Sequence, residues 1–431
     1  MPTDPLRVSD RKTTGAGAPK SPGGKPSIVG KLRIAIYYPW VYLTSGAERT
    51  LLEVARRSRH EVTIFTSRYE PEATFPGLRD VDVRVLDSVS VHRSPLQVAR
   101  SGLRIFTRRI DLRGFDALLV VCEGLGDLVV LRNLGIPAFN LCLTPLRIVF
   151  DPVYRANHLA NRSAFERLLI RAGSVVFRWI DRLAWRRYRM VFPISAEVKR
   201  RIEAGGLAPA HRLRILHPGV DLEAFVPSTE SDRTFFVPGR IMWTKNLELA
   251  IEAFRRFRER APEPASWRLR IAGIVDRKSE PYLEKLRELA RGDDAIEFCV
   301  HPDDEQMRSF YRTCFATLFT AFNEDWGLVV IEAMATGKPC VALDRGGPRE
   351  IVRHGQDGLL AEPDAEAFAG AMLRLVTEPG LRDRIAEAGP ASAARFGWQP
   401  FVDTLDRALE ESLHDGASDP ARRRQEKEAA V

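Results

Sequence analysis

The spacing of two glutamates is the most informative feature of the sequence for the chemistry of a binding site. Glu324 and Glu332 lie eight positions apart. A glycine, Gly327, and the start of the apolar segment 328–335 separate them. If both belonged to one helix, they would be about 12 Å apart along its axis. Carboxylate pairs that cleave glycosidic bonds are closer, about 5 Å apart in retaining enzymes and under about 10 Å in inverting ones. We therefore expect the two carboxylates to accept hydrogen bonds from opposite ends of one elongated ligand.

The backbone between the glutamates is suited to phosphate. Gly327, Leu328 and Val329 stand where a loop enters a helical segment. Unpaired N–H groups and the positive dipole end make a helix N-terminus a binding site for anions. A ligand with a sugar near Glu324, a ribose near Glu332 and a diphosphate on these amides fits the spacing. The alternative is that Glu332 faces solvent and Glu324 lies in a surface loop.

A second segment offers cations for the same diphosphate. The apolar strand pattern 235–238 runs into Gly239 and Arg240, and Lys245 precedes the helical pattern 247–254. Arginine presents a planar fork of donors and lysine a compact point charge, and both suit phosphate oxygens. The alternative is that both cations are solvated surface charges.

Several segments together resemble the retaining glycosyltransferases of family 4, which have two Rossmann-like domains in the GT-B arrangement. The similarity extends over about residues 31–413. Mannosyltransferase-like members share the motif Thr144-Pro145-Leu146-Arg147 followed by Asp151. The other segments are Gly239–Asn246, Glu324–Glu332, the interdomain linker His217–Asp221 and the closing elements Gly346–Val352 and Gly355–Leu360.

The resemblance implies a metal-independent hexosyltransferase that has no cofactor and retains configuration. The donor would be a GDP- or UDP-linked sugar, with mannose favoured by the Thr144–Arg147 motif. The acceptor would be lipid-linked or a polysaccharide of the cell envelope. The resemblance assigns catalysis to Glu324, Arg240 and Lys245. It assigns donor binding to Gly46, Gly239, Arg240, Lys245, Glu324, Gly327, Leu328, Val329 and Glu332, and the acceptor side to Thr144, Arg147 and Asp151.

The sequence departs from the family pattern at two positions. Leu143 stands where related members have a histidine before Thr-Pro, and a leucine cannot donate or accept a proton. His158 and Glu123 are the nearest candidates to replace it. Ser45 occupies the place of one of two loop glycines beside Gly46, so an ordinary helix-start loop is the alternative there. Leu143 keeps a second function open, a catalytically silent scaffold that binds a nucleotide sugar without turnover.

The acidic and cysteine residues do not indicate a metal site. Asp80-Val81-Asp82 has the letters of a metal-binding DxD motif, but its alternating surroundings predict an exposed strand edge. Asp303 opens a helical pattern, so we expect it to cap that helix. The five cysteines have no paired spacing, which predicts no zinc site and a reducing, cytoplasmic location.

Alternating strand and helix patterns predict an α/β fold with two doubly wound parallel sheets that face a central cleft. The strand patterns begin at Leu32 and restart at Thr234, and a chain of 431 residues is too long for one core. The resemblance implies an acceptor domain over 31–217, a nucleotide-sugar domain over 218–397 and a helix over 398–413 that returns to the first domain. The segments 1–30 and 414–431 have the composition of disordered tails.

The net charge of +8 requires a partner of opposite charge or a solvated basic face. Six apolar positions from Phe165 to Leu183 follow helical spacing beside arginines that extend from Arg167 to Arg189. Such a helix suits an anionic membrane surface, here the inner face of a membrane. The alternative is that its apolar side packs on the first-domain core and its basic side faces water.

Other functions fit the sequence less well. No nucleic-acid-binding module is recognisable, so we do not expect a nucleic-acid partner. No Gly-x-Gly-x-x-Gly follows a strand, which disfavours a dinucleotide oxidoreductase. A peripheral membrane protein without sugar chemistry would leave the segment Glu324–Glu332 unexplained.

Overall fold

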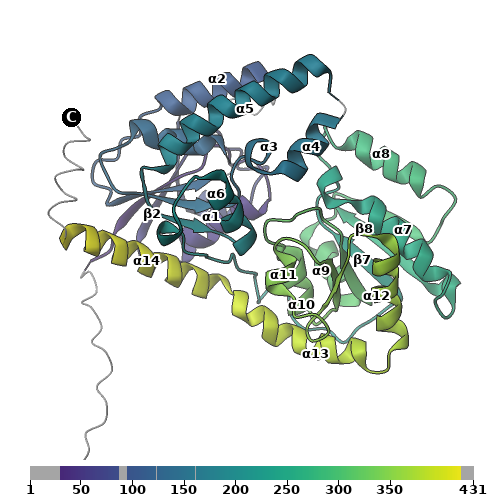
Figure 1. Ribbon diagram of the computed structural model, residues 1–431. Coiled ribbons are helices and arrows are strands. Elements are labelled where there is room, and N and C mark those ends of the chain that lie inside the picture. The colour runs from purple at the N-terminus through teal and green to yellow at the C-terminus, as the bar shows by residue number, and fades with distance from the viewer. Residues whose placement is uncertain (1–29, 87–94, 123, 161, 419–431) are drawn as a thin grey trace, which may run out of the picture.

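Short buried strands alternate with helices in both halves of the chain and pair into two parallel sheets of six strands each (Figure 1). The computed structural model describes residues 30–86, 95–122, 124–160 and 162–418. Nearly all of the predicted tail 1–30, and residues 419–431 of the other tail, lie outside this description. The two doubly wound sheets confirm the predicted fold class.

The first lobe has the strand order β3-β2-β1-β4-β5-β6. Its strands are β1 (Arg33–Tyr37), β2 (Glu61–Thr66), β3 (Asp82–Val85), β4 (Ala117–Cys122), β5 (Ala138–Cys142) and β6 (Tyr188–Pro193). Its helices are α1 (Gly46–Arg57), α2 (Pro95–Thr107), α3 (Arg147–Phe150), α4 (Pro152–Ala160), α5 (Ala164–Trp185) and α6 (Ala196–Gly205), with the 3-10 helix η2 (Leu125–Arg132). The order reverses between β1 and β4, and ligands of such sheets bind at the carboxyl ends of the strands beside that reversal.

The second lobe repeats this plan with the order β12-β11-β10-β7-β8-β9. Its strands are β7 (Thr234–Pro238), β8 (Arg268–Gly273), β9 (Ile296–Val300), β10 (Ala316–Phe319), β11 (Cys340–Leu343) and β12 (Leu359–Ala361). Its helices are α7 (Leu247–Arg258), α8 (Glu280–Leu289), α9 (Asp304–Thr313), α10 (Leu328–Ala335), α11 (Pro348–Ile351), α12 (Ala365–Thr377) and α13 (Leu381–Ala393). Here the reversal lies between β7 and β10.

The segment after α5 differs from the prediction. We expected the arginine-rich helix to continue to Arg189, but α5 ends at Trp185 and strand β6 begins at Tyr188. Val191 and Phe192 are buried beside β5. Aromatic and β-branched side chains favour a pleated, packed strand. The arginines on both sides of the boundary made the helical spacing look continuous.

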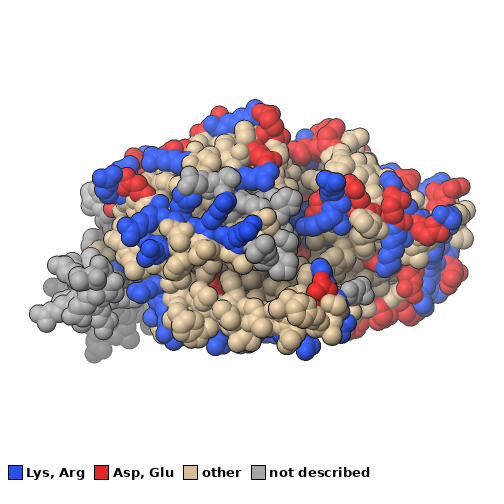
Figure 2. All heavy atoms as spheres, turned by 90° about the horizontal axis from the view of Figure 1, so that it is seen from above, with Lys and Arg blue, Asp and Glu red and all other residues tan. Residues whose placement is uncertain are grey.

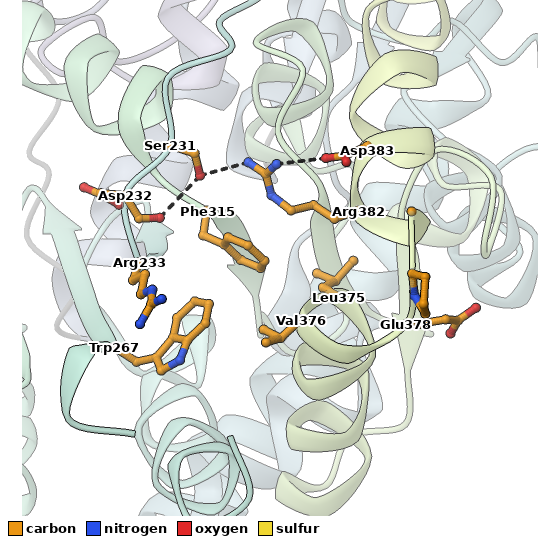
Figure 3. A pocket seen from close by; sticks show the side chains of 12 residues that line it. Ser231, Asp232, Arg233, Trp267, Phe315, Leu375, Val376, Glu378, Arg382 and Asp383 are labelled. Atoms are coloured by element: carbon orange, nitrogen blue, oxygen red, sulfur yellow. Dashed lines mark hydrogen bonds and ion pairs between the residues drawn. The ribbon is translucent and has the colours of Figure 1, made fainter. Parts of the chain in front are cut away.

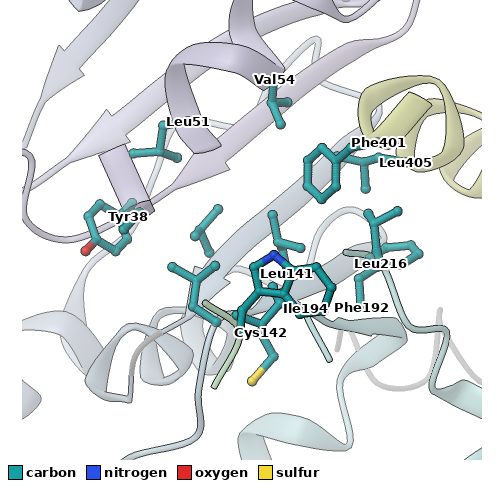
Figure 4. Close-up of a cluster of buried hydrophobic side chains, with 14 of the residues drawn as sticks. Tyr38, Leu51, Val54, Leu141, Cys142, Phe192, Ile194, Leu216, Phe401 and Leu405 are labelled. Atoms are coloured by element: carbon teal, nitrogen blue, oxygen red, sulfur yellow. The ribbon is translucent and has the colours of Figure 1, made fainter. Parts of the chain in front are cut away.

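Helix α14 (Trp398–Ser418) lies along the first lobe, although it follows the last helix of the second (Figure 1). Phe401 and Leu405 belong to one buried cluster with side chains of α1 and β5 (Figure 4). Asp406 accepts a hydrogen bond from the backbone N–H of Arg59 at 3.0 Å. The helix continues five residues beyond the predicted end at 413, to Ser418.

The chain passes between the lobes twice, and the two passages touch. The backbone N–H of Val220 donates to the carbonyl of Phe396 at 2.8 Å. A Cβ added to Gly219 would lie 2.5 Å from the backbone nitrogen of Trp398. Such a distance leaves no room for any side chain, so glycine is required where the linker crosses the start of α14.

Replacing Gly219 by alanine should lower the free energy of unfolding by about 1–3 kcal/mol, the usual cost of overpacking. Chemical denaturation followed by tryptophan fluorescence measures the change. The matched control is Gly370→Ala inside α12, where an added Cβ would meet no atom within 4 Å. That change should stabilise the protein by about 0.5–1 kcal/mol through helix propensity. An unaltered stability in Gly219→Ala would contradict the close contact of the two passages.

Candidate active site between the lobes

The two loops that carry the predicted donor residues leave neighbouring strands of the second sheet. Gly239 and Arg240 follow β7, and the segment 320–324 follows β10. The carboxyl ends of neighbouring parallel strands meet at one edge of the sheet, and here that edge is the point where the strand order reverses. The topology therefore brings the cations of one loop to the carboxylate of the other.

Lys245 is fixed by hydrogen bonds between these loops. Its backbone carbonyl accepts from the Thr320 hydroxyl at 2.9 Å, and the backbone N–H of Phe322 donates to the Thr244 carbonyl at 2.9 Å. The Lys245 ammonium lies 2.8 Å from Oε2 of Glu324. The two side chains are 17% and 24% exposed, so the ion pair borders solvent.

Glu324 lies within a cluster of positive charge. Burial opposes its ionisation, but Lys245, Arg147 and Arg240 outweigh this effect and hold the pKa of Glu324 below its ordinary value. Glu324 is therefore a carboxylate at neutral pH. Arg240 is exposed, and within the described ranges of the chain it has no ion pair of its own. Its guanidinium is available to an anionic ligand.

The predicted phosphate-binding amides face the first lobe. Helix α10 begins at Leu328, directly after Gly327, whose φ of 120° favours glycine. Helix α1 begins at Gly46, and a Cβ added to Gly46 would lie 3.5 Å from Cδ1 of Leu328. Two helix N-termini therefore approach each other across the lobe boundary. Both offer backbone N–H groups and a positive dipole end to an anion.

Glu332 is a positioned carboxyl in α10. The hydroxyl of Tyr311, a buried side chain, donates a hydrogen bond to Oε2 of Glu332 at 2.7 Å. Burial raises the pKa of Glu332 above its ordinary value, against the opposing effects of the Tyr311 hydrogen bond and of Arg49 in α1. The charge of Arg49 comes from the first lobe, so Glu332 also borders the junction. This arrangement differs from the alternative of a glutamate that simply faces solvent.

The predicted acceptor-side residues are linked to one another. Asp151 is fully buried and accepts from Nη2 of Arg147 at 2.9 Å and from two backbone N–H groups of α4 at 3.0 Å each. It therefore caps α4 and fixes Arg147. A further hydrogen bond joins Nη2 of Arg147 to the Asn323 carbonyl of the second lobe at 3.2 Å. Thr144 and Arg147 keep part of their surface exposed, whereas Asp151 acts through Arg147.

Three residues of this junction were missed in the sequence analysis. Arg201 of α6 is buried, donates to the Thr144 hydroxyl at 2.9 Å and forms an ion pair with Asp325 of the second lobe. Glu350 of the second lobe accepts from two backbone N–H groups in the first turn of α6, at 2.7 and 3.1 Å. Nothing in the sequence distinguishes Arg201 from the other arginines. Asp325 and Glu350 did carry a signal, since they lie in the segments Glu324–Glu332 and Gly346–Val352 that the sequence analysis named.

Among the described residues around Leu143, His158 is the candidate to replace the family histidine. Leu143 is buried directly after β5. His158 stacks on Tyr154, with ring centroids 6.1 Å apart, and Tyr154 packs against Trp243 of the second lobe at 5.3 Å. Burial and nearby Arg162 lower the pKa of His158, so its imidazole is neutral at pH 7. The ring of Tyr154 thus lies between His158 and the turn that carries Lys245. Glu123 is outside the described residues.

The acidic motifs have the structural roles that we predicted. Asp82 lies in β3, an edge strand, and accepts hydrogen bonds from Thr63 and Arg84. Asp303 caps α9 through the backbone N–H of Gln306. In the part of the chain that the structure describes, no group of three His, Cys, Asp or Glu side chains is arranged to hold a metal ion.

A cavity of about 400 Å³ lies at the opposite edge of the second sheet (Figure 3). Arg233, Trp267 and Phe315 line it, and they directly precede strands β7, β8 and β10. Its arginines are engaged, since Arg233 pairs with Glu263 and Arg382 with Asp383. The cavity therefore lies at the amino ends of the strands, away from the predicted donor residues.

Comparison with known proteins finds relatives of the whole chain and of its second lobe. The sequence model of the family described as "Glycosyl transferases group 1" matches residues 222–392. That segment holds Arg240, Lys245, Glu324 and Glu332. Among similar proteins, the D-inositol 3-phosphate glycosyltransferase of Acidothermus cellulolyticus is 32% identical over 235 residues, which are 50% of this chain and 52% of that protein. The alpha-1,3/1,6-mannosyltransferase ALG2 of Mus musculus is 25% identical over 386 residues, which are 84% of this chain and 92% of that protein.

Solved structures agree with the fold. Anabaena Alr3699/HepE in complex with UDP and glucose matches with a TM-score of 0.66 and 18% identity, over 89% of this chain and 99% of that chain. Sucrose-phosphate synthase from Thermosynechococcus elongatus matches with a TM-score of 0.67 and 17% identity, over 88% and 99%. This chain spans about half the length of the inositol phosphate glycosyltransferase, 52%, and most of the mannosyltransferase, 92%. The resemblance predicted from the motifs agrees with these matches: residues 222–392, most of the second lobe, match the model of group 1 glycosyl transferases.

Proposed function

We propose that this chain transfers a sugar from a nucleoside-diphosphate donor to a lipid-linked or polysaccharide acceptor in cell-envelope glycan synthesis, with retention of configuration. The observation that carries the proposal is the charge cluster at the lobe boundary. There the Lys245–Glu324 pair, 2.8 Å apart, lies near Arg240 and Arg147. The N-termini of α1 and α10 meet beside it. A diphosphate is the group that such cations and backbone N–H groups suit.

The leaving group explains why the cations are needed. When the bond between the sugar and the donor diphosphate breaks, negative charge grows on the diphosphate. Lys245, Arg240 and the amides of Gly327–Val329 would hold that charge without having to move, because they are already in position. The acceptor hydroxyl would attack the sugar, which is oxocarbenium-like, from the face that the diphosphate leaves, and its proton would pass to an oxygen of the departing diphosphate. Attack on this face retains the configuration. Exclusion of water by the two lobes would limit hydrolysis of the donor.

Lys245 can serve the donor without losing its partner. An ammonium has three N–H donors, and Glu324 accepts one of them at 2.8 Å. The remaining donors can bind phosphate oxygens, while the second oxygen of Glu324 accepts from sugar hydroxyls. Glu324 therefore orients the sugar and keeps Lys245 in place, and it need not attack the sugar itself.

Glu332 would bind the ribose. One of its oxygens accepts from Tyr311, and the other can accept from a ribose hydroxyl. Glu332 lies four residues after Leu328, the first residue of α10. The ribose would therefore lie beyond the backbone N–H groups that bind the diphosphate. Both ends of the donor are then held by carboxylates, as the spacing in the sequence predicts.

The similar proteins differ in the sugar and the nucleotide that their names mention. One relative is named a mannosyltransferase, and one structure of similar fold is in complex with UDP-glucose. We favour a mannose-type, GDP-linked donor because of the Thr144–Arg147 motif. We also propose that the reaction needs no metal and no cofactor, since side-chain cations can neutralise the diphosphate. Turnover that survives a chelator would support this, and turnover restored only by a divalent cation would refute it.

The site is proposed to work in a reducing, cytoplasmic compartment. In the described part of the chain, Cys299, Cys314 and Cys340 are free thiols. Disulfides are rare in such a compartment. This supports the location and does not depend on the donor.

A catalytically silent scaffold is the second candidate function. The observation that favours it is the buried leucine at position 143, which cannot exchange a proton with a substrate. A scaffold would bind the donor and release it unchanged, whereas the transferase would release nucleoside diphosphate only when acceptor is present. Donor binding and turnover, measured separately, distinguish the two.

The donor site predicts selective nucleotide binding that depends on two cations. Calorimetric titration with GDP and UDP should give binding to one of them. Lys245→Ala and Arg240→Ala should each weaken it about 10- to 100-fold, the cost of losing a hydrogen bond to a charged group. Arg240 has no ion pair to disrupt, so its variant separates ligand binding from local folding. Lys285→Ala, at an exposed lysine of α8 in the same lobe, is the control and should bind like the wild type.

Loss of affinity in the Lys285→Ala control as well would show a general charge effect and count against the site. Absence of binding of both nucleotides to the wild type would contradict the transferase and the scaffold together.

The Glu332 assignment predicts a defect that depends on the ribose hydroxyls. Glu332→Gln keeps the size of the side chain and an oxygen that can accept from Tyr311. It should weaken binding of the preferred nucleotide about tenfold or more and leave binding of the 2′,3′-dideoxy nucleotide unchanged. An equal loss with both nucleotides would assign Glu332 a structural role.

The same variant predicts the pH dependence of binding. Because burial raises the pKa of Glu332, its carboxylate is fully present only above that raised value. The ratio of wild-type to Glu332→Gln affinity should be constant above that pKa and should fall as the pH is lowered through it. Both proteins bind the same nucleotide, so the ratio cancels the effect that protonation of the nucleotide phosphate has on affinity. A ratio that rises as the pH falls would contradict the assignment.

A further inference from the structure

Helix α5 turns its most apolar face outward. Seven positions recur at spacings of three and four residues and therefore form one stripe along the helix. These positions define the outward face of α5: Phe165, Leu168, Leu169, Ala172, Val175, Val176 and Trp179. Their side chains are exposed, and the largest fractions are 69% for Phe165, 68% for Val175 and 66% for Trp179. The alternative that the apolar side of this helix packs on the first-domain core is therefore wrong for these seven positions.

The inward face of α5 is held by polar as well as apolar side chains. Ser174, Asp181, Ala184 and Trp185 are the buried residues of the helix. Burial and the neighbouring Asp127 raise the pKa of Asp181 well above its ordinary value, so a protonated carboxyl can be accommodated there. A hydrogen-bonded capping box at Ser163 starts the helix. The fold thus fixes α5 with a fully formed apolar face in contact with solvent.

Arginines follow the outward face along one side. At 100° per residue, Arg167, Arg171, Arg178 and Arg182 fall in one band next to the apolar stripe. Helix α2, which packs on η2 as α5 does, adds exposed Arg100, Leu103 and Arg104. Figure 2, which looks down on this side of the molecule, shows Lys and Arg side chains gathered over the first lobe beside uncharged surface.

We propose that the outward face of α5 docks on an anionic lipid bilayer. An apolar stripe with adjacent arginines and an exposed tryptophan has the chemistry of a helix that lies in the plane of a membrane surface. Exposed Arg167 and Arg171 would contact anionic headgroups, and the aliphatic and aromatic side chains would enter the boundary of the acyl chains. Contact with water is unfavourable for such an apolar stripe. Contiguous apolar patches of this kind are uncommon on the surfaces of monomeric proteins. Among the helices that the structure describes, none is both long and apolar enough to cross a bilayer.

The docking surface is connected to the acceptor side of the junction. Arg178 of α5 donates to the carbonyl of Val149 at 3.2 Å and lies over the ring of Phe150, 5.8 Å from its centroid. Both residues belong to α3, which begins at Arg147. A bilayer under α5 would therefore lie on the side of the first lobe from which a lipid-linked acceptor could reach Arg147. This last step rests on the proposed function, whereas the docking itself does not.

Sedimentation of the full chain with lipid vesicles tests the proposal. At about 0.1 M salt, where charges are screened beyond about 10 Å, the wild type should bind vesicles of mixed phosphatidylglycerol and phosphatidylcholine. It should bind pure phosphatidylcholine vesicles much more weakly. Arg167→Glu and Arg171→Glu should each weaken binding by about fivefold or more. Leu169→Glu and Val176→Glu should weaken it on both kinds of vesicle.

Matched controls lie on the second lobe. Val226→Glu alters an exposed valine that is half accessible, 50%, and Arg277→Glu reverses an exposed arginine. Both should bind vesicles like the wild type. Equal losses in these controls, or no binding of the wild type to anionic vesicles, would overturn the proposal.

Two further measurements complete the test. Nitroxide-labelled lipids should quench tryptophan fluorescence in the wild type, and Trp179→Leu should lose most of that quenching. Sedimentation velocity without lipid tests the alternative that a second copy of the chain covers the outward face of α5. A stable dimer that Leu169→Glu dissociates would assign the face to self-association and overturn the lipid assignment. Nucleotide titration should be unchanged in all α5 variants, so failure of the docking and failure of the donor site are separately visible.

Discussion

An ionised carboxylate surrounded by cations is the interaction on which the junction of the two lobes depends. Without Glu324, the charges of Lys245, Arg147 and Arg240 would repel one another where the loops after β7 and β10 meet. Opposite charges about 4 Å apart attract by about 4 kcal/mol at an effective dielectric constant of 20. The carboxylate therefore allows cations to gather before any ligand arrives. Cations that are already in place are what a departing diphosphate requires.

The same junction also decides how the lobes face each other. Arg201 pairs with Asp325, and Glu350 accepts hydrogen bonds from the first turn of α6. Both contacts join the first lobe to loops that border Glu324. The linker at Gly219 and the start of α14 touch behind them and fix the other side of the boundary. A motion of one lobe against the other would thus change the acceptor side and the donor side together, as expected of enzymes that close around their substrates.

The fold, and the set of charged side chains that meet between β7 and β10, could be predicted because their signals are local. Strand and helix periods alternate along the chain, and Arg240, Lys245 and Glu324 lie in short segments whose spacing is itself informative. Arg201 could not be found in this way, because its importance comes from the distance to Asp325 in the folded chain. Helix α5 shows a related limit. Periodicity predicted an apolar stripe, but it does not say whether that stripe faces the core or the solvent.

A crystal structure of the chain with the nucleoside diphosphate that it binds would test the central claim most directly. The account predicts that the phosphates lie between the N-termini of α1 and α10, within hydrogen-bond distance of Lys245 and Arg240. The Lys245–Glu324 pair should remain intact and the ribose should contact Glu332. A nucleotide bound elsewhere, for example in the cavity beside Trp267, or phosphates that contact neither cation, would contradict it.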